Sequence, residues 1–108
     1  MSLQICCAVT FWQRLLGVRA LPDRDAPDWG LLLPRCWAVH TVGLAHPLDV
    51  LFVTAAGEVL RVARALPPNR WVAHFGAWGV LELPAGYCSV PGWSERVSAA
   101  WGDWKIDV

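Results

Sequence analysis

The chain has 108 residues, of which 56% are hydrophobic and 17% are charged, with nine basic and nine acidic side chains. This composition excludes a disordered chain and provides a core for a single domain over residues 1–108. The balanced charge offers no basic field for phosphate groups, and Arg61, Arg64 and Arg70 form only a loose cluster. We therefore expect no general nucleic-acid binding.

Membrane insertion and export are also not expected. The longest uncharged run is interrupted by His40, His46 and Pro47, well short of the ~20 apolar residues that span a bilayer. The first residues lack the basic start and small-residue cleavage site of a signal peptide, which predicts a cytoplasmic protein. The cysteines form no C-x-x-C pair, so we expect reduced, structural thiols, with Cys36 as the main exception.

The predicted elements begin with a buried strand over Leu3–Val9 and a short helix over Phe11–Leu16, followed by a charged loop over Val18–Trp29. Six strands are expected next, over Gly30–Leu33, Cys36–His40, Pro47–Val53, Val59–Ala65, Trp71–Phe75 and Trp78–Leu83. A short helix over Ser94–Ala100 and a last strand near Trp104–Val108 complete the chain. Short strands between Gly/Pro turns predict a mainly β fold, a compact single-domain β-sandwich or barrel with one or two short helices.

Eight tryptophans are spread along the chain, which suits a core and its rim better than one stacking platform. The C-terminal group, Trp93, Trp101 and Trp104, is the exception. These three side chains either cover an open end of the sheet or form an outer apolar patch. An outer patch would allow a homo-oligomer through exposed Trp, or docking into a larger assembly.

The most informative segment is residues 36–53, because His40, Thr41 and Asp49 interrupt an otherwise apolar run. Buried polar side chains cost free energy unless they are paired, so these three need a structural or functional reason. A turn at Val42–Ala45 would bring them together, and the aspartate would then orient the imidazole. A structural role, ligand recognition and catalysis all remain open for this group.

Metal binding and nucleophilic catalysis have weaker support. His40, His46, His74, Asp49 and Cys36 could supply ligands, but the spacing of His40 and His46 matches no standard zinc motif. Cys36 and His40 lie four residues apart, which is about 13 Å on a strand and too far for activation of the thiol. We therefore expect no metal, no cofactor and no catalytic residues.

Glu82 is one more acid within an apolar strand. Alternation places it on the opposite face from Leu81 and Leu83, and we expect that face to be turned outward. If Glu82 pointed inward, it would need an ion pair with Arg35 or Arg61, at a cost that only good geometry offsets.

The chain resembles the family catalogued as domain of unknown function 192, through six motifs in order over about residues 10–88. They are Phe11-Trp12 to Leu16-Gly17, Gly30–Leu33 with Pro34-Arg35-Cys36, Val39-His40-Thr41-Val42-Gly43-Leu44, Pro47-Leu48-Asp49-Val50-Leu51-Phe52, Gly57-Glu58-Val59-Leu60 and Glu82-Leu83-Pro84-Ala85-Gly86. The resemblance implies a compact β-sandwich-like domain with short helices and no established activity. Leu44 replaces the usual methionine, His46 stands where an aromatic residue is usual, and the Trp-rich tail over residues 89–108 diverges.

The sequence favours a non-enzymatic module that binds a small ligand or a protein partner beside His40, Thr41 and Asp49. No nucleophile, phosphate loop or metal set accompanies these residues, which is why binding ranks first. The alternatives are a small hydrolase-like enzyme with His40 and Asp49 as an acid–base pair, or a structural accessory of a larger assembly that docks through the C-terminal tryptophans.

Overall fold

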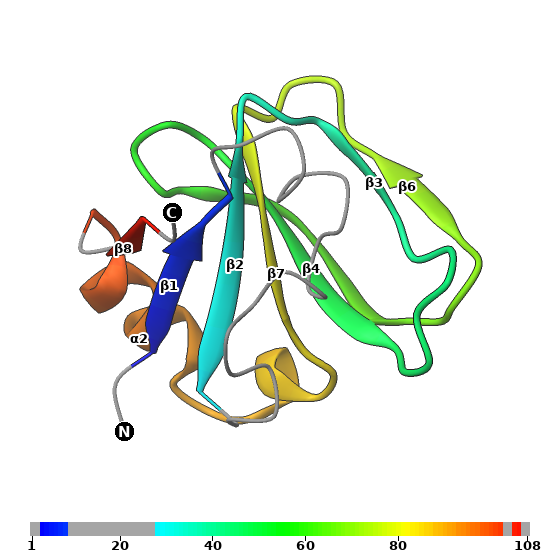
Figure 1. The fold of residues 1–108 in the computed structure, drawn as a ribbon. Coiled ribbons are helices and arrows are strands. Elements are labelled where there is room, and N and C mark those ends of the chain that lie inside the picture. The colour runs from blue at the N-terminus through cyan, green and yellow to red at the C-terminus, as the bar shows by residue number, and fades with distance from the viewer. Residues whose placement is uncertain (1–2, 9–27, 103–104, 107–108) are drawn as a thin grey trace.

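The computed structural model describes residues 3–8, 28–102 and 105–106, and its largest element is a six-stranded mixed sheet (Figure 1). Its strands are β1 (Gln4–Cys7), β2 (Trp29–Pro34), β4 (Leu48–Val53), β5 (Val59–Leu66), β7 (Gly79–Pro84) and β8 (Lys105–Ile106). They lie in the order β5-β4-β7-β2-β1-β8. β1 runs parallel to both of its neighbours, and the other pairs are antiparallel.

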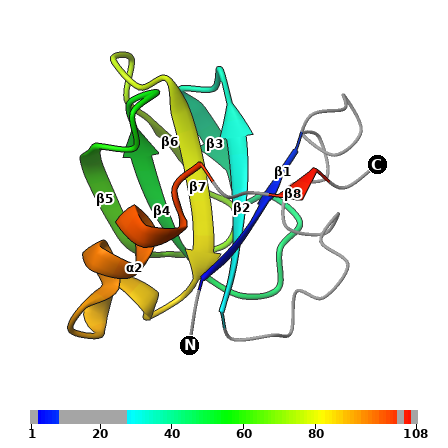
Figure 2. The same ribbon diagram turned by 90° about the vertical axis from the view of Figure 1, so that its left-hand side faces the viewer.

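A second, two-stranded sheet consists of β3 (Ala38–His40) and β6 (Trp71–Ala73), paired antiparallel. This β3–β6 ribbon lies on one side of the main sheet, and helix α2 (Trp93–Ala100) lies on the other (Figure 2). A 3-10 turn, η2 (Tyr87–Ser89), leads from β7 toward α2. The main sheet is therefore covered on both faces, which is why its strands are rich in buried apolar residues.

The core has two parts, one on each face of the main sheet. Val50 and Phe52 of β4 pack in the cluster that includes Val39 of the ribbon. Leu51 and Val53 pack in the cluster that carries the residues of η2 and α2. All six residues of β4 are buried, as expected for a central strand covered on both sides.

The C-terminal tryptophans that the structure describes cover the sheet. Trp93 and Trp101 are half-buried and pack against the second cluster. The indole N–H of Trp101 donates to the carbonyl of Ala55, and its ring lies directly over Gly57 in the β4–β5 turn. These two side chains are therefore not an outer docking patch, while Trp104 lies outside the described residues.

The predicted fold class is confirmed: the protein is mainly β, in one compact unit with short helices. Each predicted strand within the described residues is present, with bounds that differ by about two residues at most. The helix predicted over Ser94–Ala100 is α2. The helix predicted over Phe11–Leu16 lies outside the described residues, as does most of the loop that follows it. Within residues 3–8, 28–102 and 105–106, no helix is long and apolar enough to cross a membrane.

Candidate functional site

Two turns that are far apart in the sequence meet at Thr41, which is fully buried. Its hydroxyl donates to the carbonyl of Pro67 and accepts from the backbone N–H of Arg70 at 3.0 Å. Its backbone N–H donates to the carbonyl of Arg70 at 2.9 Å, and its carbonyl accepts from the N–H of Asn69 at 3.1 Å. Thr41 thus holds residues 40–44 against residues 67–71, and we refer to these two segments as the paired turns.

His40 lies directly opposite Trp71 in the β3–β6 register. The neighbouring pair, Thr41 and Arg70, is joined by a backbone hydrogen bond, so His40 and Trp71 form the kind of pair in which side chains approach closely. Their ring centroids are 4.9 Å apart. The Nδ1 of His40 accepts a hydrogen bond from the backbone N–H of Val42 at 3.2 Å. In the neutral ring, Nε2 is therefore the nitrogen that carries the proton.

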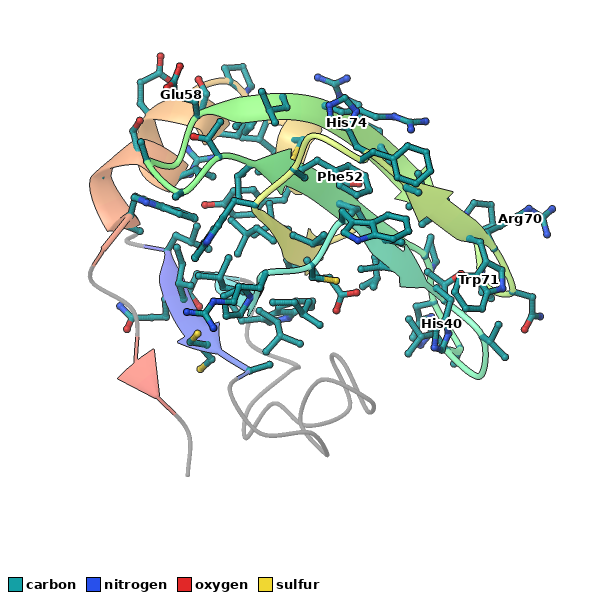
Figure 3. The ribbon with its side chains drawn as sticks, turned by 90° about the horizontal axis from the view of Figure 1, so that it is seen from above. His40, Phe52, Glu58, Arg70, Trp71 and His74 are labelled. Carbon is teal, nitrogen blue, oxygen red and sulfur yellow. The ribbon has the colours of Figure 1, made fainter. Side chains whose placement is uncertain are left out.

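Apart from the buried Thr41, the residues of the paired turns are half-buried or exposed. The indole of Trp71 is 72% exposed, and Arg70 beside it is exposed as well. The guanidinium of Arg70 contacts only the carbonyl of its neighbour Asn69, at 3.4 Å, among the contacts of the described residues. His40, Trp71 and Arg70 gather at one end of the ribbon (Figure 3). Together they present an aromatic face, a cation and an imidazole.

A second aromatic pair lies at the other end of the ribbon. The rings of Trp37 and Phe75 have centroids 4.8 Å apart, and Phe75 is 82% exposed. The imidazole of His74 packs on the ring of Phe52, whose own side chain belongs to the core. The ribbon is therefore lined at both ends by aromatic rings that water can reach, which is unusual for a surface with no contact partner.

Asp49 lies on the opposite side of the main sheet. Its flanking residues Leu48 and Val50 belong to the ribbon-side cluster, so the alternation of β4 turns Asp49 toward α2 and η2. Its carboxylate is fully buried and accepts from the backbone N–H of Ala65 and of Cys88, both at 2.8 Å. Ala65 has a left-handed φ of 50° and lies next to the break in the β4–β5 register, which marks a bulge in β5. The two hydrogen bonds of Asp49 therefore join this bulge to η2.

The predicted grouping of His40, Thr41 and Asp49 is therefore only partly formed. The paired turns bring His40 and Thr41 together, but Asp49 faces the other side of the sheet and bonds two backbone N–H groups. The turn at Val42–Ala45 does not bring Asp49 to His40 because Asp49 alternates with Leu48 and Val50, which face the ribbon side. His40 and Asp49 do not form the imagined acid–base pair, and ligand binding by each residue stays a prediction.

Glu82 faces inward, and the prediction of an outward-facing side chain was wrong. It is only 4% exposed, and its Oε1 has no hydrogen-bond partner among the described residues. Its register neighbours are Leu31 and Val50, both on the face that the ribbon side covers. The expectation was wrong because the alternation was assigned to a half-exposed strand, whereas β7 is central and covered on both faces. Burial raises the pKa of the Glu82 carboxyl from 4.5 to about 8.

The remaining candidates do not form a metal site within the part of the chain that the structure describes. Cys36 and Cys88 are free cysteines, and the thiol of Cys36 donates to the carbonyl of Ala38. Burial, helped by the nearby Asp49 carboxylate, raises the pKa of the Cys88 thiol to about 12. That thiol is protonated and unreactive at neutral pH.

Arg70, Trp71 and Phe75 are the surface residues that the sequence did not single out. Trp71 and Phe75 were assigned to a strand, and strands usually bury their aromatic side chains. One signal was available: Pro67-Pro68-Asn69 breaks the chain directly before Arg70 and Trp71. A strand that starts after such a turn exposes its first side chains more readily than a central strand does.

Comparison with known proteins shows a shared fold. No family model matches the chain, and no curated protein matches it. A protein from Sinorhizobium meliloti 1021, provisionally assigned as a transcription regulator, is 27% identical over 78% of this chain and 70% of its own, with a TM-score of 0.67. A protein of unknown function from Novosphingobium aromaticivorans DSM 12444 is 21% identical over 77% of this chain and 64% of its own, with a TM-score of 0.62. The chain is therefore similar in fold to two solved structures, and it spans less than two thirds of the length of the second.

Proposed function

We propose that this protein is a non-enzymatic binding module whose contact surface is the paired turns. The observation that carries the proposal is the His40–Trp71 ring pair, in which Trp71 is exposed and His40 is half-buried, next to the buried Thr41 that holds the two turns together. A rigid, solvent-facing aromatic surface with donors at its rim is typical of sites that recognise a partner. Pre-organisation lowers the entropy cost of binding, and the hydrogen bonds of Thr41 provide it.

The rival function, an enzyme with His40 and Asp49 as acid and base, has less support. Both oxygens of Asp49 accept backbone hydrogen bonds on the far side of the sheet. Nδ1 of His40 accepts a hydrogen bond from the backbone N–H of Val42, so a backbone amide and not a carboxylate holds that nitrogen. A general base needs an orienting partner and a nearby nucleophile, and the paired turns bring neither to His40.

Membership of the family catalogued as domain of unknown function 192 is a further part of the proposal. The six ordered motifs support it, and so does a mainly β fold in which the His40–Leu44 motif forms one of the paired turns. The provisional assignment of the Sinorhizobium protein as a transcription regulator supports a binding role over a catalytic one. An alignment built from homologues of this chain tests the membership: it should reach known members with His40 and Thr41 aligned to their shared motif.

A panel of anionic and neutral probes tests the binding role. The full chain is titrated by calorimetry with a glutamate-rich peptide, an oligothymidylate, a sulfated polysaccharide and a neutral one. Wild-type protein is compared with Trp71→Ala and with Val90→Ala, a matched control because Val90 is another exposed hydrophobic residue that lies beside η2. We expect at least one probe to bind, with an affinity that falls for Trp71→Ala and stays at the wild-type value for Val90→Ala.

Two results would contradict the proposal. The first is that no probe of the four chemistries binds. The second is that a probe binds equally well to wild-type protein and to Trp71→Ala, which would place its site elsewhere. Light scattering on the same samples tests the predicted homo-oligomer, because Trp37 and Trp71 are the exposed tryptophans of the described chain.

A further inference from the structure

The exposed charge of this protein is unevenly distributed although its net charge is zero. Among the acidic side chains that the structure describes, Asp49 and Glu82 are buried in the core. Glu58 lies just before β5, at the end far from the paired turns (Figure 3). Asp28 precedes β2 and its carbonyl accepts from the N–H of Gln4 in β1, whereas Glu95 belongs to α2, which lies on the other side of the sheet (Figure 2). Described acids are thus absent from the outer face of the ribbon.

Two arginines lie near the two ends of β6 instead. The guanidinium of Arg61 donates to the carbonyl of Ala73 in β6 at 2.9 Å and lies 5.9 Å from the ring centroid of Phe52. Arg70 is exposed at the start of β6. Neither arginine has an ion-pair partner among the described residues, so their charges are not neutralised locally. A cationic rim without counter-charges attracts anionic partners even when the whole molecule is neutral.

Exposed rings lie between and beside these cations. Trp71 and Phe75 are 72% and 82% exposed, and each ring packs against one neighbouring ring, that of His40 and that of Trp37. Trp71 is the first residue of β6, and Phe75 lies in the turn that follows the strand. Exposed aromatic rings at the two ends of β6, with an arginine near each end, match the combination of stacking faces and cations that binds single-stranded nucleic acids.

We infer that the partner of the paired turns is a single-stranded nucleic acid, with bases stacked on Trp71 and Phe75 and phosphates beside Arg61 and Arg70. This inference rests on the proposed binding function and names its ligand class. A duplex is excluded as the partner because its bases are already stacked, which leaves their faces closed to exposed rings. An acidic peptide would satisfy the arginines and leave the aromatic faces uncovered, so it fits the surface less well.

The whole-molecule charge balance does not contradict this site. Net charge governs long-range attraction, whereas stacking and local phosphate contacts operate within a few ångströms. The expectation against nucleic-acid binding was drawn from the total charge and from arginines that are scattered in the sequence. The fold brings Arg61 and Arg70 to the two ends of β6, because Arg61 bonds the last residue of that strand.

Fluorescence anisotropy of a dye-labelled oligothymidylate tests the inference with the full chain. Wild-type protein should bind saturably, and Trp71→Ala and Phe75→Ala should each weaken binding about tenfold, as expected for the loss of one stacked base. Arg70→Ala should lower the slope of log K against log salt by about 0.7, which corresponds to one phosphate contact on a single strand. Val90→Ala serves as the control, and circular dichroism verifies that each variant is folded.

The outcomes separate this inference from the function on which it rests. If the oligothymidylate does not bind but a glutamate-rich peptide does, with loss in Trp71→Ala, the ligand class is wrong and the binding surface stands. If a self-complementary duplex binds more tightly than the single strand, stacking on the rings is contradicted. If the oligothymidylate binds equally to wild type and to Trp71→Ala and Phe75→Ala, both the ligand site and the proposed surface are overturned.

Discussion

The hydroxyl of Thr41 accepts a hydrogen bond from the backbone N–H of Arg70 at 3.0 Å, across 29 residues of sequence. This bond lies next to the ring pair of the half-buried His40 and the exposed Trp71, which occupy the neighbouring position of the register. The rigidity of the candidate surface thus depends on a residue that no ligand can reach, because Thr41 is fully buried. Substitutions at Thr41 should therefore lower both the free energy of unfolding and the affinity for a partner. Substitutions elsewhere should change only one of the two.

Thr41→Val should destabilise the protein by about 1–3 kcal/mol, because the buried N–H of Arg70 and carbonyl of Pro67 both lose their partner. Urea denaturation measures the loss. Thr41→Ser keeps the hydroxyl and should recover most of the stability, apart from the contribution of one methyl group. A larger loss for Thr41→Ser than for Thr41→Val would show that the methyl group, and not the hydroxyl, holds the paired turns together.

Asp49→Asn should also lower the free energy of unfolding, by about 1–3 kcal/mol, without changing affinity for any probe. The carboxylate accepts hydrogen bonds from two backbone N–H groups. In the asparagine variant an NH2 group replaces one of the two oxygens, so one backbone N–H faces another donor and loses its acceptor. Denaturation and calorimetry on the same variant separate the two effects. Lost affinity in a variant of wild-type stability would mean that Asp49 binds the ligand and that its structural assignment is wrong.

Glu82→Gln should become increasingly more stable than wild type as the pH rises. The pKa of the folded carboxyl, about 8, lies above its ordinary value of 4.5, so the unfolded chain releases its proton first. The favourable contribution of the protonated group is complete below pH 4.5 and is lost as the pH rises to 8, at a slope of about 1.4 kcal/mol per pH unit. Urea denaturation of both proteins from pH 4 to 9 measures the difference in their free energies of unfolding. A difference that does not change with pH would contradict a buried Glu82 carboxyl with a raised pKa.

Gly57→Ala should destabilise the protein more than Gly86→Ala does. Both glycines have a left-handed φ, of 90° and 88°, so both variants should lose about 1–2 kcal/mol from backbone strain. Only at Gly57 would the new Cβ meet a side chain, since it would lie 2.6 Å from the ring of Trp101, whereas nothing lies within 4 Å at Gly86. Thermal denaturation compares them, and equal melting temperatures would show that Trp101 does not cover the β4–β5 turn.

The sequence predicted most of the strands because their apolar runs and Gly/Pro breaks depend on local chemistry. β4 is an example: its apolar run ends at Thr54 in a turn, and the structure has the strand over Leu48–Val53. The side of the sheet that each polar residue faces was harder to predict. That choice depends on which strands lie at the centre, and Glu82 was misplaced because β7 pairs with β2 and β4, which are distant in sequence.

The sequence predicted only part of the candidate site. His40 and Thr41 were identified because polar residues in an apolar run need a reason, and the paired turns supply one. Asp49 was grouped with them because it is near in sequence, although the alternation of β4 turns it to the opposite face. Trp71 and Arg70 were missed because contacts across 29 residues leave no local pattern.

Chemical-shift mapping of the isotope-labelled protein during titration with an oligothymidylate tests whether the paired turns bind a single strand. We expect the largest changes at the indole N–H of Trp71 and at the backbone N–H groups of Val42 and Arg70, which lie on the paired turns. The amides of α2 should keep their positions, because that helix lies on the other side of the main sheet (Figure 2). Changes that concentrate on α2 and leave the Trp71 indole unmoved would show that the strand binds elsewhere and that the paired turns are not the binding surface.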